Sequence, residues 1–480
     1  MGAIVVPPAT VVPHREGETF NVKGLRLTDH FFTVPLDHFV QPSDDSSMDA
    51  PASRETITVF AREVIATSKA SDPTFDKQKL PALLFLQGGP GFEAARPTET
   101  GGWLQEACKE FRVFLLDQRG TGRSAKISVD SLRREFGDDD QGKASYISHH
   151  RSDSIVADAE CIRHTVLGAD TKWTLLGQSF GGFCITRYLC ASPNGVREAL
   201  YTGGLPPLIR HPGNAALGTY GKLLERIKTQ NVKYYKRFPG DVGSVRGIAE
   251  FLREKGPQQT PNGSRLSLRG LQALGFSNLG VSGGFERLHY LLETAWDVEG
   301  ETLSYSFLKG VDDALAFDTN PLYAVAHESI YCNGGGEPSA WAAETALRGG
   351  GTYGFDTSLE CDFGEKAPFY FTGEMVFPFM FDEISALRPL KNAANILATK
   401  TDWTVLYDAD VLNENTVPVA CASYTEDAFV DWDLANETAR EILGARVWST
   451  SEYMHSGIRE DGAVVFSKLL AMVRGDDPMR

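Results

Sequence analysis

Residues 173–182, Trp-Thr-Leu-Leu-Gly-Gln-Ser-Phe-Gly-Gly, decide how this chain folds. A short apolar run leads into Gly-X-Ser-X-Gly at 177–181, and a segment with helical periodicity follows over 181–191. Small residues around a serine between a strand and a helix permit a strained turn that projects the hydroxyl above the sheet. The pattern therefore predicts that Ser179 is a nucleophile.

The same spacing occurs a second time, in Gly280-Val281-Ser282-Gly283-Gly284. The residues before it, Gly-Phe-Ser-Asn-Leu, do not resemble a strand. Without a strand the serine lacks the context that the motif needs. We expect Ser282 to lie in a glycine-rich turn before a helix.

Working outward from Ser179, short apolar runs alternate with helical patterns. The runs predict strands at 81–86, 112–117, 198–204, 417–424 and 445–449, and the helical patterns lie at 152–167, 433–443 and 460–473. Such alternation is typical of a mostly parallel sheet with helices on both faces. Residues 31–36 and 57–61 alternate instead, which predicts antiparallel strands joined by the polar stretch 41–53.

The alternation stops between residues 206 and 390, where the segments are longer and more helical and glycines cluster at 283–284, 334–336 and 349–351. We interpret this part as a large, mainly helical insertion. The predicted organisation is a first core part at 1–205, a cap at 206–390 and a second core part at 391–480.

Composition narrows the class of protein. The 480 residues include 47 basic and 63 acidic side chains, a net charge of −16, which disfavours binding to nucleic acid or to an anionic membrane. Seven scattered cysteines without Cys-X-X-Cys spacing argue against a disulfide framework or a zinc site. We expect no metal, no cofactor, no signal peptide and a cytoplasmic location, and the sequence does not indicate an oligomeric state.

A serine nucleophile needs a base, and the base needs an orienting carboxylate. Of ten histidines, His455 follows a late strand in a polar loop, Ser-Glu-Tyr-Met-His-Ser-Gly. The loop after 417–424 offers the acid, and Asp427 is favoured because it comes three residues after the strand. Glu426 and Asp431 remain alternatives, although Asp431 and Asp433 are well placed to cap the next helix.

Negative charge that forms on a substrate carbonyl must meet backbone N–H groups. One should come from Phe180, the residue after the nucleophile. The other should come from Gly88 and Gly89, in the Gly-Gly-Pro-Gly loop directly after the first core strand. These three residues are the predicted oxyanion hole.

Four motifs taken in order, Gln-Gly-Gly-Pro-Gly at 87–91, Asp-Gln-Arg-Gly-Thr-Gly-Arg-Ser at 117–124, Gly-Gln-Ser-Phe-Gly-Gly at 177–182 and Glu-Tyr-Met-His-Ser-Gly from 452, resemble those of the proline iminopeptidases. The resemblance runs from about residue 30 to 473 and is closest to the branch with an enlarged cap. It implies an α/β-hydrolase fold and a serine peptidase. The family carries His where this chain has Gln87, which leaves the backbone donors of the loop in place.

The resemblance also implies that cap glutamates hold the free amino group of the substrate, and it points to Glu328 and Glu374. Charge-assisted hydrogen bonds to a cationic terminus contribute roughly 1.5–3 kcal/mol each. A carboxylate in the apolar run around Glu374 is costly unless a cation meets it. His327 and Tyr331 are candidates for the same pocket, or for core positions.

Together these features predict an aminopeptidase that releases an N-terminal residue, preferably proline, from peptides with a free N-terminus. The first alternative is an esterase or amidase of small molecules with the same three catalytic residues. The second is a catalytically silent binding protein, because a fold alone does not guarantee activity.

Overall fold

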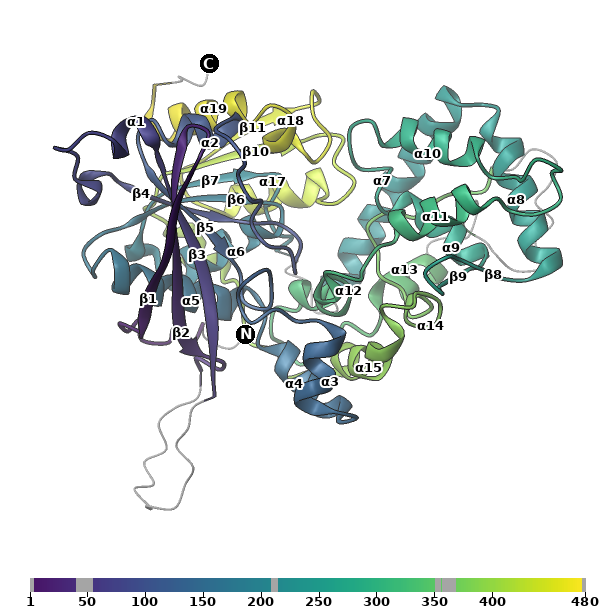
Figure 1. The fold of residues 1–480 in the computed structure, drawn as a ribbon, viewed down its shortest axis with the longest axis horizontal. Helices are drawn as coiled ribbons and strands as arrows, with labels where there is room; N and C mark the ends of the chain where they lie inside the picture. The colour runs from purple at the N-terminus through teal and green to yellow at the C-terminus, as the bar shows by residue number, and fades with distance from the viewer. Residues whose placement is uncertain (1–3, 40–54, 209–214, 350–354, 356–367, 477–480) are drawn as a thin grey trace.

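A nine-stranded sheet runs through one half of the molecule (Figure 1). The computed structural model describes residues 4–39, 55–208, 215–349, 355 and 368–476. The strand order is β1-β2-β3-β5-β4-β6-β7-β10-β11. The strands are β1 (His14–Val22), β2 (Leu25–Pro35), β3 (Thr56–Ala66), β4 (Ala82–Leu86), β5 (Arg112–Asp117), β6 (Trp173–Gln178), β7 (Val196–Thr202), β10 (Val419–Tyr424) and β11 (Ala445–Thr450).

The sheet combines two kinds of pairing, as the sequence predicts. Strands β1, β2, β3 and β5 pair antiparallel, and the six strands from β5 through β11 pair parallel. All six strands predicted in the core are present within two residues of their expected limits. The polar stretch 41–53 and the glycines at 350 and 351 lie outside the described residues.

Helices cover both faces of the sheet, and the strand side chains alternate between them. In β4, Leu84 and Leu86 belong to the apolar cluster that includes α5 (Ser152–Val166) and α6 (Phe180–Ala191). Leu83 and Phe85 face the opposite cluster, with α2 (Gly102–Ala107) and α19 (Gly462–Arg474). Both faces of each central strand are buried, which explains its continuous apolar sequence.

A mainly helical part lies beside the sheet (Figure 1). It contains α7 (Ala215–Arg237), α8 (Asp241–Lys255), α9 (Leu268–Gln272), α10 (Gly284–Glu293), α11 (Tyr305–Ala314), α12 (Pro321–Ala326), α13 (Ala342–Gly349) and α14 (Met380–Glu383), with a short hairpin of β8 (Gln258–Gln259) and β9 (Arg265–Leu266). We refer to this part as the cap, and the boundaries at 205/206 and 390/391 stay a prediction. Helix α15 (Lys391–Thr399) packs on α12 and on α4 (Asp140–Ser148). None of the helices in the described ranges combines the length and apolarity needed to cross a bilayer.

Candidate active site

Ser179 occupies the sharp turn between β6 and α6, with φ 54° and ψ −124°. The two flanking glycines are required by close backbone contacts. A Cβ at Gly181 would lie 1.9 Å from the carbonyl oxygen of Leu86, and a Cβ at Gly177 would lie 2.6 Å from the carbonyl carbon of Gly181. The backbones of β4 and α6 therefore hold the strained serine turn. They could not approach each other this closely if larger residues replaced Gly177 and Gly181.

His455 and Asp427 meet at the same end of the sheet. The imidazole Nδ1 lies 2.7 Å from Oδ2 of Asp427. The other carboxylate oxygen, Oδ1, accepts hydrogen bonds from the backbone N–H groups of Phe429 at 2.8 Å and Val430 at 3.0 Å. The ring of Phe429 also packs edge-on against the imidazole, with 4.8 Å between ring centroids. These contacts fix the ring and leave Nε2 as the nitrogen available for proton transfer.

Ser179 and His455 line one cavity of about 490 Å³. Within the described part of the chain, the Ser179 hydroxyl makes no hydrogen bond to His455. The imidazole Nε2 instead lies 3.4 Å from Nε2 of Gln178, the residue before the serine. Long or poorly aligned contacts between nucleophile and base are common before substrate binds, and they tighten in the complex.

The two alternative acids are engaged elsewhere. Glu426 forms an ion pair with Lys233 of α7. Asp431 is the N-cap of α17 (Trp432–Glu441), where its Oδ1 accepts from the N–H groups of Asp433 and Leu434, each at 3.1 Å. Of the three acids considered from the sequence, Asp427 is the one that contacts the imidazole.

The second Gly-X-Ser-X-Gly segment lies in the turn before α10. The hydroxyl of Ser282 donates a hydrogen bond of 2.8 Å to Glu460 at an exposed position. The preceding residue, Val281, lines the cavity. Ser282 thus has a carboxylate partner but no contact with an imidazole among the described residues.

The loop predicted to supply oxyanion donors packs directly on the serine turn. A Cβ at Gly88 would lie 2.9 Å from the Cβ of Ser179, and Gly89 lines the cavity with φ 133°. Gly91 approaches the cap, since a Cβ there would lie 2.7 Å from the backbone nitrogen of Tyr323. The carbonyl of Gln87 accepts a hydrogen bond of 2.9 Å from the Gln118 side chain, which anchors the loop from below.

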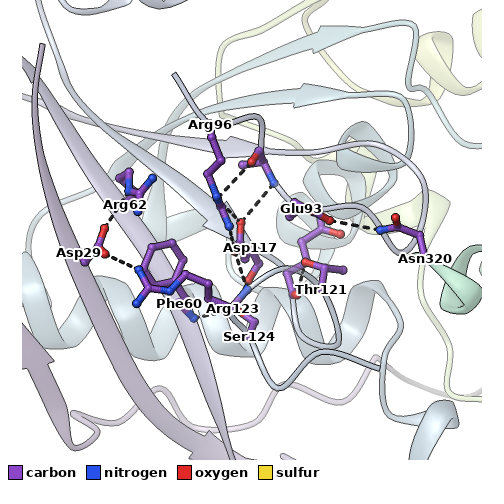
Figure 2. A network of polar contacts seen from close by, with 12 residues as sticks. Asp29, Phe60, Arg62, Glu93, Arg96, Asp117, Thr121, Arg123, Ser124 and Asn320 are labelled. Carbon is purple, nitrogen blue, oxygen red and sulfur yellow. Dashed lines mark hydrogen bonds and ion pairs between the residues drawn. The ribbon is translucent and has the colours of Figure 1, made fainter. Parts of the chain in front are cut away.

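A charged network holds the next stretch of the loop, residues 92–97, and sequence reasoning missed it (Figure 2). The fully buried carboxylate of Asp117 forms an ion pair with Arg96 and accepts a hydrogen bond of 2.9 Å from the backbone of Arg123. On the other side of the loop, the amide of Asn320 donates to Glu93 at 3.2 Å (Figure 2). Loop and cap are therefore joined next to the cavity.

Glu374 reaches the cavity from the cap side. It lines the cavity and accepts a hydrogen bond from the hydroxyl of Tyr323. Burial raises the pKa of Glu374 to about 7, opposed by the electrostatic effect of the nearby His455 and by the Tyr323 hydrogen bond. Aromatic rings make up much of the remaining wall: Phe92, Phe276, Phe317, Tyr323 and Phe429.

Glu328 is placed differently. It is not among the residues that line the cavity, and its Oε1 accepts a hydrogen bond of 3.0 Å from the N–H of Ala343, in the first turn of α13. Burial raises the pKa of Glu328 to about 7, with hydrogen bonds from Ala343 and Ser339 acting in the opposite direction. His327 and Tyr331 are likewise buried outside the lining, with the His327 ring edge-on to Tyr323.

Three further charged residues of the lining were not anticipated. Glu93 and Asp313 add negative charge, and Arg459 is the one lysine or arginine among the lining residues described. Glu93 could have been predicted as a lining residue, because it directly follows Gly-Gly-Pro-Gly-Phe at 88–92. Arg459 lies four residues after His455, a spacing that puts it close to the base.

Comparisons with known proteins identify relatives of this chain. Residues 81–246 match the model of the alpha/beta hydrolase fold. The chain is 43% identical over 451 residues to a proline iminopeptidase of Aeromonas sobria, covering 94% of this chain and 97% of that protein. It is 29% identical over 456 residues to the proline iminopeptidase aneH of Aspergillus aculeatus, covering 93% of each. Among solved structures, a 2-hydroxy-6-oxo-6-phenylhexa-2,4-dienoate hydrolase from Rhodococcus aligns with TM-score 0.37 at 12% identity, over 87% of this chain and 95% of that one, too distant to support an argument.

Proposed function

This chain belongs to the proline iminopeptidases, serine hydrolases of the α/β-hydrolase fold, and we propose that it releases N-terminal proline from peptides through Ser179, His455 and Asp427. The observation that carries the proposal is the 2.7 Å contact of Asp427 with His455, which lines the same cavity as Ser179.

In the proposed acylation step, His455 Nε2 takes the proton of the Ser179 hydroxyl as the oxygen attacks the carbonyl of the first residue. Asp427 keeps the Nδ1 proton in place and stabilises the imidazolium. The imidazolium then gives its proton to the leaving amine, and the acyl-enzyme forms. Water, activated by the same imidazole, hydrolyses that ester and regenerates the serine.

The backbone amides of Phe180, Gly88 and Gly89 are proposed to hold the oxyanion. Phe180 begins α6, so its N–H lies at a helix N-terminus, where unpaired donors and the helix dipole favour negative charge. Gly88 is close enough to the serine that a side chain would collide with it. Removing one donor of such a site typically slows acylation by about 10²–10³-fold.

The carboxylate of Glu374 is the proposed contact for the substrate's ammonium group. It stands in the cavity, and its burial makes an approaching cation favourable because the cation compensates a charge that would otherwise be poorly solvated. The aromatic wall suits the apolar pyrrolidine ring of proline. Glu328 keeps its predicted role in amine binding as a second proposal, although its carboxylate caps α13.

A substrate panel tests this function. Wild-type protein should hydrolyse prolyl-β-naphthylamide. It should hydrolyse N-acetyl-prolyl-β-naphthylamide at least about 100-fold more slowly, since acetylation removes the positive charge that Glu374 is proposed to bind. Ser179→Ala should abolish both reactions. Hydrolysis of p-nitrophenyl esters without any cleavage of prolyl-β-naphthylamide would favour a small-molecule esterase. Absence of both activities in the wild type would favour a silent binding protein.

A further inference from the structure

A second cavity, of about 390 Å³, adjoins the first. Four residues line both cavities: Gln87, Ala95, Gln178 and Arg459. Gln178 immediately precedes Ser179, so the two cavities meet next to the nucleophile. A substrate bound at Ser179 can therefore extend from one into the other.

The walls of the second cavity are mostly apolar. Its large apolar lining residues are Phe85, Trp103, Leu104, Leu115 and Ile458. The ring of Trp103 stacks on Phe85 with 4.7 Å between centroids. These side chains come from β4, β5, α2 and the short helix α18 (Gly457–Glu460), so this cavity is formed by the core of the fold and not by the cap.

Two of the charged groups around this cavity are already neutralised. The guanidinium of Arg96 is paired with the buried carboxylate of Asp117. Glu99 is paired with Lys23 at 3.1 Å, with both side chains largely exposed. Both groups therefore already have a partner of opposite charge.

Arg459 differs from both. Its Nη2 donates a hydrogen bond of 3.1 Å to Oε1 of Gln178, a neutral acceptor. Across the ranges that the structure describes, no carboxylate lies within ion-pair distance of this guanidinium. A guanidinium can bind a carboxylate through two parallel N–H donors, and this one is oriented by its contact with the residue beside the nucleophile.

We propose that the second cavity receives the leaving part of the peptide and that Arg459 binds its C-terminal carboxylate. This inference rests on the proposed function and specifies its substrate class: dipeptides with proline first and an apolar residue second. The leaving residue of a dipeptide is short, because consecutive Cα atoms are about 3.8 Å apart, and Arg459 lines both cavities and contacts Gln178, the neighbour of Ser179. The acids of the first cavity then bind the ammonium group of the dipeptide, and Arg459 binds its carboxylate.

The test compares prolyl-phenylalanine with prolyl-phenylalaninamide, which differ only in the C-terminal charge. Wild type should show a kcat/KM about tenfold or more higher for the free acid, the size expected of a charge-assisted bidentate contact. In Arg459→Gln the ratio should fall toward 1, and Arg459→Lys should give an intermediate ratio. Arg440→Gln, which removes an exposed arginine in the last turn of α17, is the matched control and should keep the wild-type ratio.

Using the ratio within each variant removes any general loss of activity or folded protein from the comparison. A wild-type ratio near 1, or an undiminished ratio in Arg459→Gln, would overturn the inference. Cleavage of prolyl-β-naphthylamide, which has no carboxylate, separates the two proposals. If that substrate is cleaved but the ratio is 1, the leaving-group site is wrong while the proposed function stands.

A second pair of dipeptides tests the apolar wall of the second cavity. Wild type should prefer prolyl-phenylalanine over prolyl-glycine, because the aromatic side chain enters the cavity beside Trp103. Trp103→Ala should reduce this preference while leaving the acid-to-amide ratio above 1. Equal rates for the two dipeptides in the wild type would contradict the assignment of the cavity to the leaving residue.

Discussion

The hydroxyl of Tyr323 donates a hydrogen bond to the carboxylate of Glu374. The same tyrosine meets Gly91 of the oxyanion loop through its backbone, and its ring packs on Phe92 with 4.9 Å between centroids. One cap residue thus contacts both the group proposed to hold the substrate's amine and the loop proposed to hold the oxyanion. We expect this contact to set the relative position of the proposed amine-binding carboxylate and the proposed oxyanion hole.

Tyr323→Phe should shift the pH profile of peptidase activity. The hydrogen bond lowers the pKa of Glu374, against burial that raises it to about 7, so its removal should raise that pKa further. Since amine binding needs the ionised carboxylate, the acid limb of kcat/KM for prolyl-β-naphthylamide should move to higher pH. An unmoved acid limb with a uniformly lower rate would mean that Tyr323 contributes packing only.

Glu374→Gln should lower kcat/KM for prolyl-β-naphthylamide by about 10- to 100-fold, because a charge-assisted hydrogen bond to the ammonium is lost. Hydrolysis of p-nitrophenyl acetate, which has no amine, should change by less than about threefold. The matched control is Glu383→Gln in α14, whose carboxylate accepts from Ser267 at 2.8 Å away from the cavity lining. Equal losses on the amide and the ester would contradict the role of Glu374 in amine binding.

Glu328→Gln should change stability in a pH-dependent way. The folded-state pKa is raised from 4.5 to about 7 by burial, so the folded protein binds an extra proton between these values and its free energy of unfolding falls as pH rises through this window. Glutamine does not ionise, so the variant lacks this loss of stability at high pH. Between pH 4.5 and pH 8 its free energy of unfolding should rise by up to about 3 kcal/mol relative to that of the wild type. Urea unfolding at the two pH values measures it.

The same variant distinguishes two roles for Glu328. If it caps α13 alone, Glu328→Gln should keep kcat/KM for prolyl-β-naphthylamide within about threefold of wild type. A loss as large as that of Glu374→Gln would place Glu328 in amine binding, as the resemblance to the family implies.

Arg96→Leu should destabilise the fold by about 2–4 kcal/mol, because it leaves the buried carboxylate of Asp117 without its ionic partner. Arg133→Leu, which breaks an exposed 3.7 Å pair with Asp130 on α3 (Val129–Phe136), should cost less than about 1 kcal/mol. The comparison of the two by urea unfolding tests whether the network of Figure 2 stabilises the loop. Equal, small effects would mean that solvent replaces Arg96.

The positions of the three proposed catalytic residues in the fold could be predicted from local sequence pattern. Ser179 and Asp427 follow the buried strands β6 and β10, His455 follows the mostly half-buried β11, and parallel strands bring their carboxyl ends to one edge of the sheet. Strand β1 was harder to predict, since its residues are exposed or half-buried along its length and show no apolar face. Its place depends on pairing with β2 and not on burial.

The cap was harder to predict for a different reason. Whether the carboxylate of Glu328 or Glu374 reaches the cavity depends on how helices distant in sequence pack, which no local period encodes. The contact of Asn320 with Glu93 joins residues from cap and core in the same way. The sequence around Arg459 is typical of a charged surface loop. The contact of Arg459 with Gln178, which the sequence does not indicate, distinguishes it from other surface arginines.

Whether Ser179 is the nucleophile that His455 activates is tested most sharply by treating the protein with a fluorophosphonate and locating the adduct by peptide mass spectrometry. We expect one adduct, on Ser179, formed at a rate that falls at least about 100-fold in His455→Ala, since the imidazole is the proposed base that activates the hydroxyl. An adduct on Ser282 in place of Ser179, or labelling of Ser179 at the same rate without His455, would contradict it.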